Sequence, residues 1–154
     1  MVDSLFDTDI RHCVFITAPC EKVFETITSA EGWNAFFTTN MELDPQPGGR
    51  VVWRWTNWGP DRISGEDTAT VLDVDPPSLF RFNWHPVGPE FPTTVTMELE
   101  SRGVGTVLTL TESNYPDTPK GRATILDCAC GWGEALTLLK VYLEYGYVYG
   151  PIPE

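Results

Sequence analysis

The hydrophobic period of the chain changes near Pro19. Before it, the alternate residues from Ile10 to Ile16 would share one face of a strand. After it, Val23, Phe24 and Ile27 recur at helical spacing. A proline suits the first turn of a helix because its ring fixes φ and its missing N–H would have no partner there. The pattern therefore predicts a strand followed directly by a helix.

A second short apolar segment, Trp33, Phe36 and Phe37, follows a break at Gly32 and predicts another short helix. Five or six strands follow, each with period-two alternation and a turn-forming sequence beside it. They are expected around Val51–Trp55, Ile63–Val74, Leu79–Trp84, Val95–Leu99 and Thr106–Leu110. Such closely linked strands predict an antiparallel meander.

From about Lys120 to Tyr145 the period becomes helical again, which predicts one long helix that Gly146 ends. Its apolar stripe is expected to contain Ile125, Ala129, Trp132, Leu136, Leu139 and Leu143. Gly131 and Gly133 lie inside this helix and should weaken it by about 0.5–1 kcal/mol each relative to alanine. Small residues at these positions would let another group approach closely. We expect residues 1–154 to form one domain.

Composition narrows the classes of partner. The formal net charge is -12 and only ten residues are Lys or Arg, which argues against binding to nucleic acid or to an anionic membrane surface. The chain has no secretory-type start and no segment long enough to span a membrane. Cys128 and Cys130 would point to different faces of the long helix, so the cysteines predict reduced thiols rather than a disulfide framework. We expect a cytoplasmic protein.

Aromatic side chains gather on the sheet face that the long helix should cover. Rings here could simply fill the core, or they could surround a cavity. The candidate ligand-binding residues are His12, Trp33, Phe37, Trp53, Trp55, Phe80, Phe82, Trp84, Met97, Trp132 and Leu136. Arg54 and Arg81 alternate away from this face and are expected to pair with surface carboxylates.

Motifs for catalysis or metal binding are missing from the sequence. His12 should point inward, as a hydrogen-bonded core residue or as a polar group in a cavity. His85 is expected in a solvated loop. The two histidines are far apart and no Cys-x-x-Cys pair occurs, so we expect no metal and no cofactor. No nucleophile elbow, phosphate loop or catalytic triad is present, which favours a binding protein over an enzyme.

The ordered motifs resemble those of the SRPBCC or START-like superfamily. Within it, the chain is similar to the family of activators of the ninety-kilodalton heat-shock-protein ATPase. The matching segments are Ala18-Pro19 with Val23-Phe24, Gly32-Trp33 with Phe36-Phe37, Pro47-Gly48-Gly49, Asp75-Pro76-Pro77 with Leu79, Phe82 and Trp84, Val95-Thr96 with Leu99, Gly105-Thr106 with Leu108-Thr109-Leu110, and Gly131-Trp132 with Leu136, Leu139 and Tyr142-Leu143. The resemblance implies an α+β helix-grip fold, in which a curved antiparallel sheet wraps around a long C-terminal helix and two short helices follow the first strand.

The expected function is binding of a small, largely apolar molecule between sheet and helix: a lipid, an aromatic compound or a polyketide-like compound. One alternative is a chaperone cofactor, although such activators carry an additional amino-terminal domain that this sequence lacks. Another is a hydrolase or cyclase that uses an inward-facing polar group, for which His12 is the candidate. The protein is expected to be a monomer or a homodimer.

Overall fold

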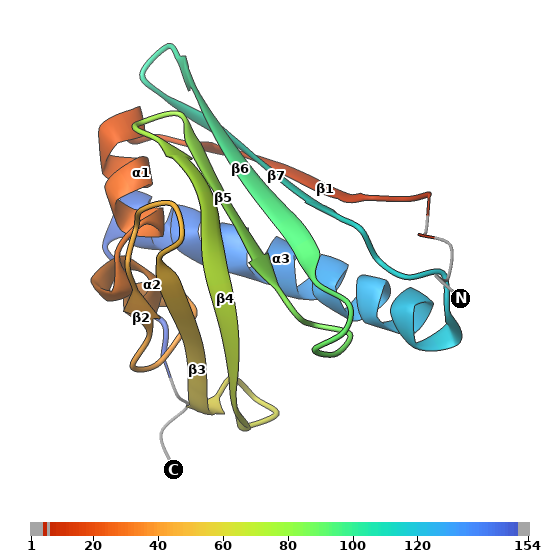
Figure 1. The fold of residues 1–154 in the computed structure, drawn as a ribbon. Coiled ribbons are helices and arrows are strands. Elements are labelled where there is room, and N and C mark those ends of the chain that lie inside the picture. Colours follow the sequence, from red (N-terminus) through yellow and green to blue (C-terminus); the bar gives the residue numbers. More distant parts are fainter. Residues whose placement is uncertain (1–4, 6, 151–154) are drawn as a thin grey trace.

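A curved antiparallel sheet grips one long helix in the computed structural model of the chain, which describes Leu5 and residues 7–150 (Figure 1). The helix-grip α+β fold expected from the sequence is therefore confirmed. The single predicted domain also included residues 1–4, Phe6 and residues 151–154, which lie outside the described residues.

The elements follow the predicted order, with one short strand added. They are β1 (Ile10–Ile16), α1 (Cys20–Ile27), α2 (Ala30–Phe36), β2 (Glu42–Leu43), β3 (Arg50–Trp58), β4 (Ile63–Asp75), β5 (Leu79–Trp84), β6 (Thr93–Arg102), β7 (Gly105–Ser113) and α3 (Pro119–Tyr145). The sequence pattern missed β2 because two residues are too few to show a period.

The sheet has the strand order β1-β7-β6-β5-β4-β3-β2. Strands β2 to β7 form the expected meander, in which each strand pairs with the next along the chain. Strand β1 instead lies beside β7, and Cys13 pairs with Thr109. Consequently β1, the first strand along the chain, forms its inter-strand backbone hydrogen bonds with β7, the last strand along the chain.

The two short helices pack together at the end of the sheet where α3 ends (Figure 1). Pro19 is the N-cap of α1 with extended backbone, one position before the first turn in which the sequence had placed it. Gly32 does not break the chain between helices but lies in the first turn of α2, where its N–H donates to the Ser29 hydroxyl over 3.1 Å. A Cβ on Gly32 would lie 2.0 Å from the Thr26 carbonyl oxygen, so this crossing requires glycine.

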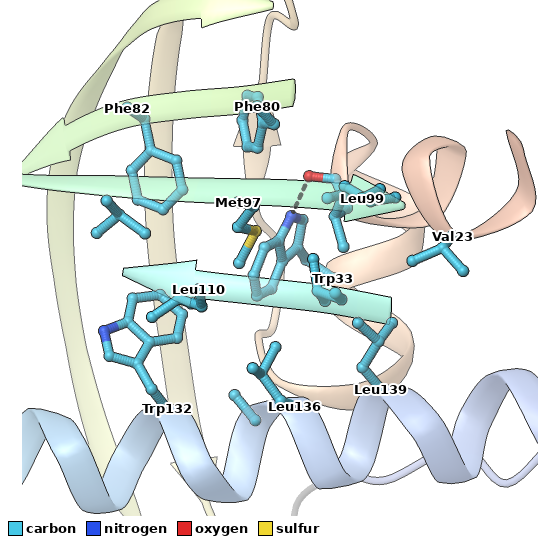
Figure 2. Close-up of a cluster of buried hydrophobic side chains, with 14 of the residues drawn as sticks. Val23, Trp33, Phe80, Phe82, Met97, Leu99, Leu110, Trp132, Leu136 and Leu139 are labelled. Atoms are coloured by element: carbon cyan, nitrogen blue, oxygen red, sulfur yellow. Dashed lines mark hydrogen bonds between the residues drawn. The ribbon is translucent and has the colours of Figure 1, made fainter. Parts of the chain in front are cut away.

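Apolar side chains from the sheet, from the short helices and from α3 form one core (Figure 2). Trp33 is fully buried, and its indole Nε1 donates to the Ile27 carbonyl over 2.7 Å. Its ring centroid lies 4.8 Å from that of Trp53 on β3. Tryptophan N–H groups usually find a partner when buried, and this bond fixes the orientation of Trp33 within the core.

Helix α3 begins at a Thr118 cap, whose hydroxyl accepts from the Gly121 N–H, and ends at Gly146 with φ of 71°. Gly146 adopts the left-handed backbone conformation, which glycine tolerates, and it ends the helix where the sequence predicted. The apolar stripe was assigned slightly wrongly, because Ala129 is exposed and Ala135 is buried. The buried arc is centred nearer to Trp132 and Leu139, so Ala129 falls outside its edge.

Arg54 and Arg81 lie on the outer face of the sheet, as predicted, and each pairs with a neighbouring carboxylate. Arg54 Nε lies 2.8 Å from Glu66 Oε2, and Arg81 Nη1 lies 3.8 Å from Asp73 Oδ2. Such exposed pairs contribute little to stability. The two arginines therefore act as surface charges, and the candidate binding residues are sought on the inner face of the sheet.

Candidate functional site: an aromatic cavity under the sheet

Two adjoining hollows lie between the sheet and the middle of α3. The larger has a volume of about 360 Å³ and is lined by Phe37, Trp55, Trp58, Ile63, Trp84, Pro86, Gly131 and Glu134. The smaller, of about 180 Å³, is lined by Phe37, Trp84, Asp127, Cys128, Gly131 and Trp132. Because they share Phe37, Trp84 and Gly131, we describe them together as the aromatic cavity.

The aromatic rings that line the cavity pack against one another. The Phe37 centroid lies 5.8 Å from Trp55 and 5.3 Å from Trp58, both in edge-on geometry. The centroid of Trp132 lies 5.6 Å from that of Trp84. Trp58 is 5% exposed and its indole Nε1 has no hydrogen-bond partner. At the rim, Ile63 is 50% exposed, so the space opens toward solvent on that side.

The structure divides ten of the eleven candidate ligand-binding residues into two groups. Phe37, Trp55, Trp84 and Trp132 line the aromatic cavity. Six others are buried in the core outside this lining: Trp33, Trp53, Phe80, Phe82, Met97 and Leu136. The lining residues Trp58, Ile63, Pro86, Cys128 and Glu134 were not among the candidates. Which residues line the hollows depends on how the sheet and α3 are placed relative to each other, and no local sequence pattern reveals that placement.

His12 lies elsewhere. It is half-buried on β1 and lines a separate groove with Ile125, Leu126 and Ala129, none of which contributes to the aromatic cavity. Its ring carbon Cε1 would lie 3.9 Å from a Cβ built on Gly133. That distance is ordinary van der Waals contact, and a Cβ on Gly131 would meet nothing within 4 Å, so the close approach expected at these two glycines does not occur at either of them.

The inward-facing polar group next to the aromatic cavity is Glu112 on β7, which is fully buried. Its Oε1 accepts from Trp132 Nε1 over 2.8 Å. Its Oε2 accepts from Trp84 Nε1 over 2.5 Å and from the Thr93 hydroxyl over 2.6 Å. One carboxyl group thus ties a ring on β5 to a ring on α3, and both rings form walls of the cavity. We call this arrangement the Glu112 clamp.

The sequence contained a signal for Glu112 that the prediction did not use. Glu112 follows Leu108 and Leu110 at period two, and all three are fully buried on the inner face of β7. An isolated carboxyl group is costly to bury, so this register predicts donors around it. The identity of those donors depends on tertiary contacts between residues that are far apart in the chain.

Tyr115 and Cys128 lie beside the Glu112 clamp. Tyr115 is fully buried, its hydroxyl has no hydrogen-bond partner, and burial together with the nearby charge of Glu112 raises its pKa far above the usual value. Burial also raises the pKa of the Cys128 thiol to about 12, and the charges of Glu112 and Asp127 add to this effect. Cys128 is therefore a neutral thiol at physiological pH.

We expect Cys128 to be alkylated far more slowly than Cys130, although both belong to α3. Cys130 is exposed and Cys128 is half-buried. With a pKa of about 12, roughly one Cys128 thiol in ten thousand is ionised at pH 8, and the thiolate is the reactive form. Iodoacetamide labelling between pH 7 and 9, with both sites resolved by tandem mass spectrometry, measures this ratio. Equal labelling in the folded protein would contradict the assignment, and equal labelling in urea is the control.

Alanine substitutions at two helical glycines should have opposite effects. A Cβ on Gly131 meets nothing within 4 Å, so Gly131→Ala should stabilise the protein by about 0.5–1 kcal/mol through helix propensity. Gly32→Ala should destabilise it by about 1–3 kcal/mol because the new methyl group overlaps the Thr26 carbonyl. Urea unfolding of both variants tests the pair. A destabilised Gly131→Ala variant would show that this face of α3 is not open.

The remaining sequence expectations concern His85 and metals. His85 was expected to be solvated, but it is half-buried and its Nδ1 lies 3.1 Å from the Thr68 carbonyl oxygen. The middle of β4 therefore orders the side chain of a residue that follows β5. Within the part of the chain that the structure describes, no group of three or more His, Cys, Asp or Glu side chains is arranged to hold a metal ion. Among the described helices, none combines the length and apolar character that a membrane span needs.

A curved antiparallel sheet that wraps a long C-terminal helix, with a hollow between them, defines a START-like helix-grip protein of the SRPBCC superfamily. A sequence profile of the family described as "Activator of Hsp90 ATPase homolog 1-like protein" matches residues 17–144. The chain belongs to this family. The resemblance inferred from the sequence is therefore confirmed.

Solved structures share this fold. The Aha1 dimer from Colwellia psychrerythraea superposes with a TM-score of 0.76 and 23% identity, covering 90% of this chain and 98% of that one. A protein from Staphylococcus saprophyticus has a TM-score of 0.73 and 26% identity, covering 92% and 95%. DynU16, from the dynemicin biosynthetic locus, has a TM-score of 0.77 and 20% identity, covering 95% of this chain and 49% of that one. No curated protein matches the chain.

Proposed function

We propose that the protein binds a small, largely apolar molecule in the aromatic cavity. The observation that carries the proposal is a hollow of about 360 Å³ with mainly aromatic walls beside the apolar core. Ligand pockets in proteins fall in the range of roughly 300–1,000 Å³ and have mainly apolar and aromatic linings. We further propose that the protein acts in the cytoplasm.

The walls of the aromatic cavity are held in place without a ligand. The Glu112 clamp fixes the indoles of Trp84 and Trp132, and Phe37 is braced by Trp55 and Trp58. Ordering side chains on binding costs roughly 0.5–1.5 kcal/mol per flexible group, so walls that are already ordered favour affinity. This preorganisation supports a binding role.

Ligand binding should be visible in the intrinsic fluorescence of the protein. Four of the six tryptophans line the aromatic cavity. We expect one lipid, aromatic or polyketide-like compound from a panel to change the emission saturably at one equivalent, with a negative heat-capacity change in calorimetry. A panel that gives no saturable change would contradict the proposal.

A matched pair of variants on α3 locates the binding site. Gly131 lies in the lining of both hollows and a side chain there meets open space, so Gly131→Leu should fill the aromatic cavity and abolish the fluorescence response. Ala123→Leu adds a leucine at an exposed position of the same helix and should leave binding unchanged. If Gly131→Leu keeps full affinity while folded, the ligand binds elsewhere.

The alternative function is that of a chaperone cofactor, and family membership is the observation that favours it. A heat-shock ATPase that binds the protein and turns over faster in its presence would support this alternative, above all if the ligand panel gives no response. The Aha1 neighbour was solved as a dimer. Size-exclusion chromatography with light scattering would show whether this protein is a monomer or a homodimer.

A hydrolase or cyclase is less well supported. Both oxygens of Glu112 already accept hydrogen bonds from Trp84, Trp132 and Thr93, which leaves the carboxyl group poorly placed to transfer a proton. The raised pKa of Cys128 disfavours a thiolate nucleophile at this wall. His12, the sequence candidate, lines a different groove.

A further inference from the structure

The lining of the aromatic cavity has a marked charge asymmetry. Its charged side chains are Asp127 and Glu134, and none of the described residues that line it is Lys, Arg or His. Both carboxylates are exposed, and the structure gives neither of them an ion pair with a described residue. They lie on α3 on either side of Gly131, at spacings of four and three residues, so they share the helix face that borders the cavity.

The apolar part of the lining is mainly aromatic rather than aliphatic. Phe37, Trp55, Trp58, Trp84 and Trp132 contribute their rings, and Ile63 is the one branched aliphatic side chain among the lining residues. The face of an aromatic ring carries negative charge density and attracts a cation within about 6 Å of its centroid, most strongly for tryptophan. An apolar pocket for neutral molecules needs no such concentration of indoles.

From these two observations we infer that the ligand of the aromatic cavity is an organic cation, an ammonium group on an apolar body. The inference rests on the proposed function and gives its ligand a chemical class. The rings accept the methyl or methylene groups around the nitrogen, and the carboxylates of Asp127 and Glu134 attract the positive charge at the rim. The same features oppose fatty acids and other anions, because the site offers them no cationic partner and places two negative charges beside the entrance.

The inference is tested with three probes of nearly the same shape. Benzyltrimethylammonium carries a quaternary nitrogen, neopentylbenzene has a carbon atom in its place, and phenylacetate is an anion of similar size. We expect the cation to bind at least about tenfold more tightly than neopentylbenzene in fluorescence titrations, and phenylacetate to bind more weakly than both. Equal affinity of the cation and its carbon isostere would overturn the inference.

Charge-neutral variants test whether the carboxylates of Asp127 and Glu134 contribute to binding of the cation. Asp127→Asn with Glu134→Gln should weaken binding of benzyltrimethylammonium by about three- to tenfold and leave neopentylbenzene unaffected, because exposed charge pairs contribute modestly. Glu21→Gln with Glu98→Gln removes two exposed carboxylates far from the cavity lining and is the matched control. An equal loss in both double variants would show a general effect of net charge and would contradict the inference.

The two proposals fail in different ways. If neopentylbenzene binds and the cation gains nothing, the aromatic cavity is a pocket for neutral molecules and only the charge preference is wrong. If none of the three probes binds, and the wider ligand panel also gives no response, the proposed binding function fails together with the inference.

Discussion

Replacing Trp132 with alanine is expected to lower the free energy of unfolding by about 3–5 kcal/mol. Trp132 is 3% exposed, and its ring lies beside those of Trp33, Trp53 and Trp84. Removing the indole deletes a wall between the core and the aromatic cavity and leaves Glu112 Oε1 without its donor. Denaturant melts measure the change, and a loss below about 1 kcal/mol would show that this part of α3 does not pack against the sheet.

Trp132→Phe separates packing from hydrogen bonding. The phenyl ring keeps most of the apolar contact but lacks the N–H that reaches Glu112. We expect a cost well below that of Trp132→Ala. If the two variants unfolded at the same denaturant concentration, the hydrogen bond rather than the ring volume would account for the loss.

Glu112→Leu is expected to destabilise the protein by about 2–4 kcal/mol, although it replaces a buried carboxyl group with a side chain that suits a core. The substitution leaves the indole N–H groups of Trp84 and Trp132 and the Thr93 hydroxyl without an acceptor. Each buried polar group left unpaired costs roughly 1–3 kcal/mol, and relief of the desolvation of the carboxyl group offsets part of the sum. Urea unfolding measures the change, and a variant as stable as the parent would contradict the prediction.

A double-mutant cycle tests whether Glu112 acts through the tryptophans. Glu112→Leu in a Trp132→Phe background has one orphaned donor fewer, so its cost should fall and the two substitutions should be non-additive by more than about 0.5 kcal/mol. Glu98→Gln removes an exposed carboxylate from the outer face of β6 and should add independently to Trp132→Phe. Additivity in both cycles would mean that the Glu112 clamp has no energetic role.

Local signals account for the part of the fold that the sequence predicted. Strand periods, the turn-forming sequences beside the strands and the Gly146 cap each depend on a few adjacent residues. The structure has a strand, a turn or a helix end at these places, and the turn from Asp75 to Ser78 is one example. The fully buried Trp53 was likewise expected on the inner face. Period and turn chemistry are sufficient for these features because they act within one element.

The aromatic cavity required tertiary information. Trp53 and Trp55 are two residues apart on the same face of β3, yet Trp53 is closed off by Trp33 and Trp55 borders empty space. Which of them lines the hollow depends on how far α2 and α3 extend beneath the strand. The same holds for Glu112, whose partners come from β5, β6 and α3. No sequence window contains all of these residues.

The pairing of β1 with β7 has a consequence for how the chain is made. Ile10 pairs with Glu112 and Ile16 with Thr106, so partners that must meet are 90 to 102 positions apart in the chain. A ribosome releases β1 long before β7 exists, and α3, which covers the inner face, emerges later still. Contacts between residues so far apart in the chain slow folding, because their loop entropy is lost before they stabilise anything. Until synthesis passes Tyr145, the aromatic face of the nascent sheet has no helix to cover it and is open to chaperones that bind apolar surface.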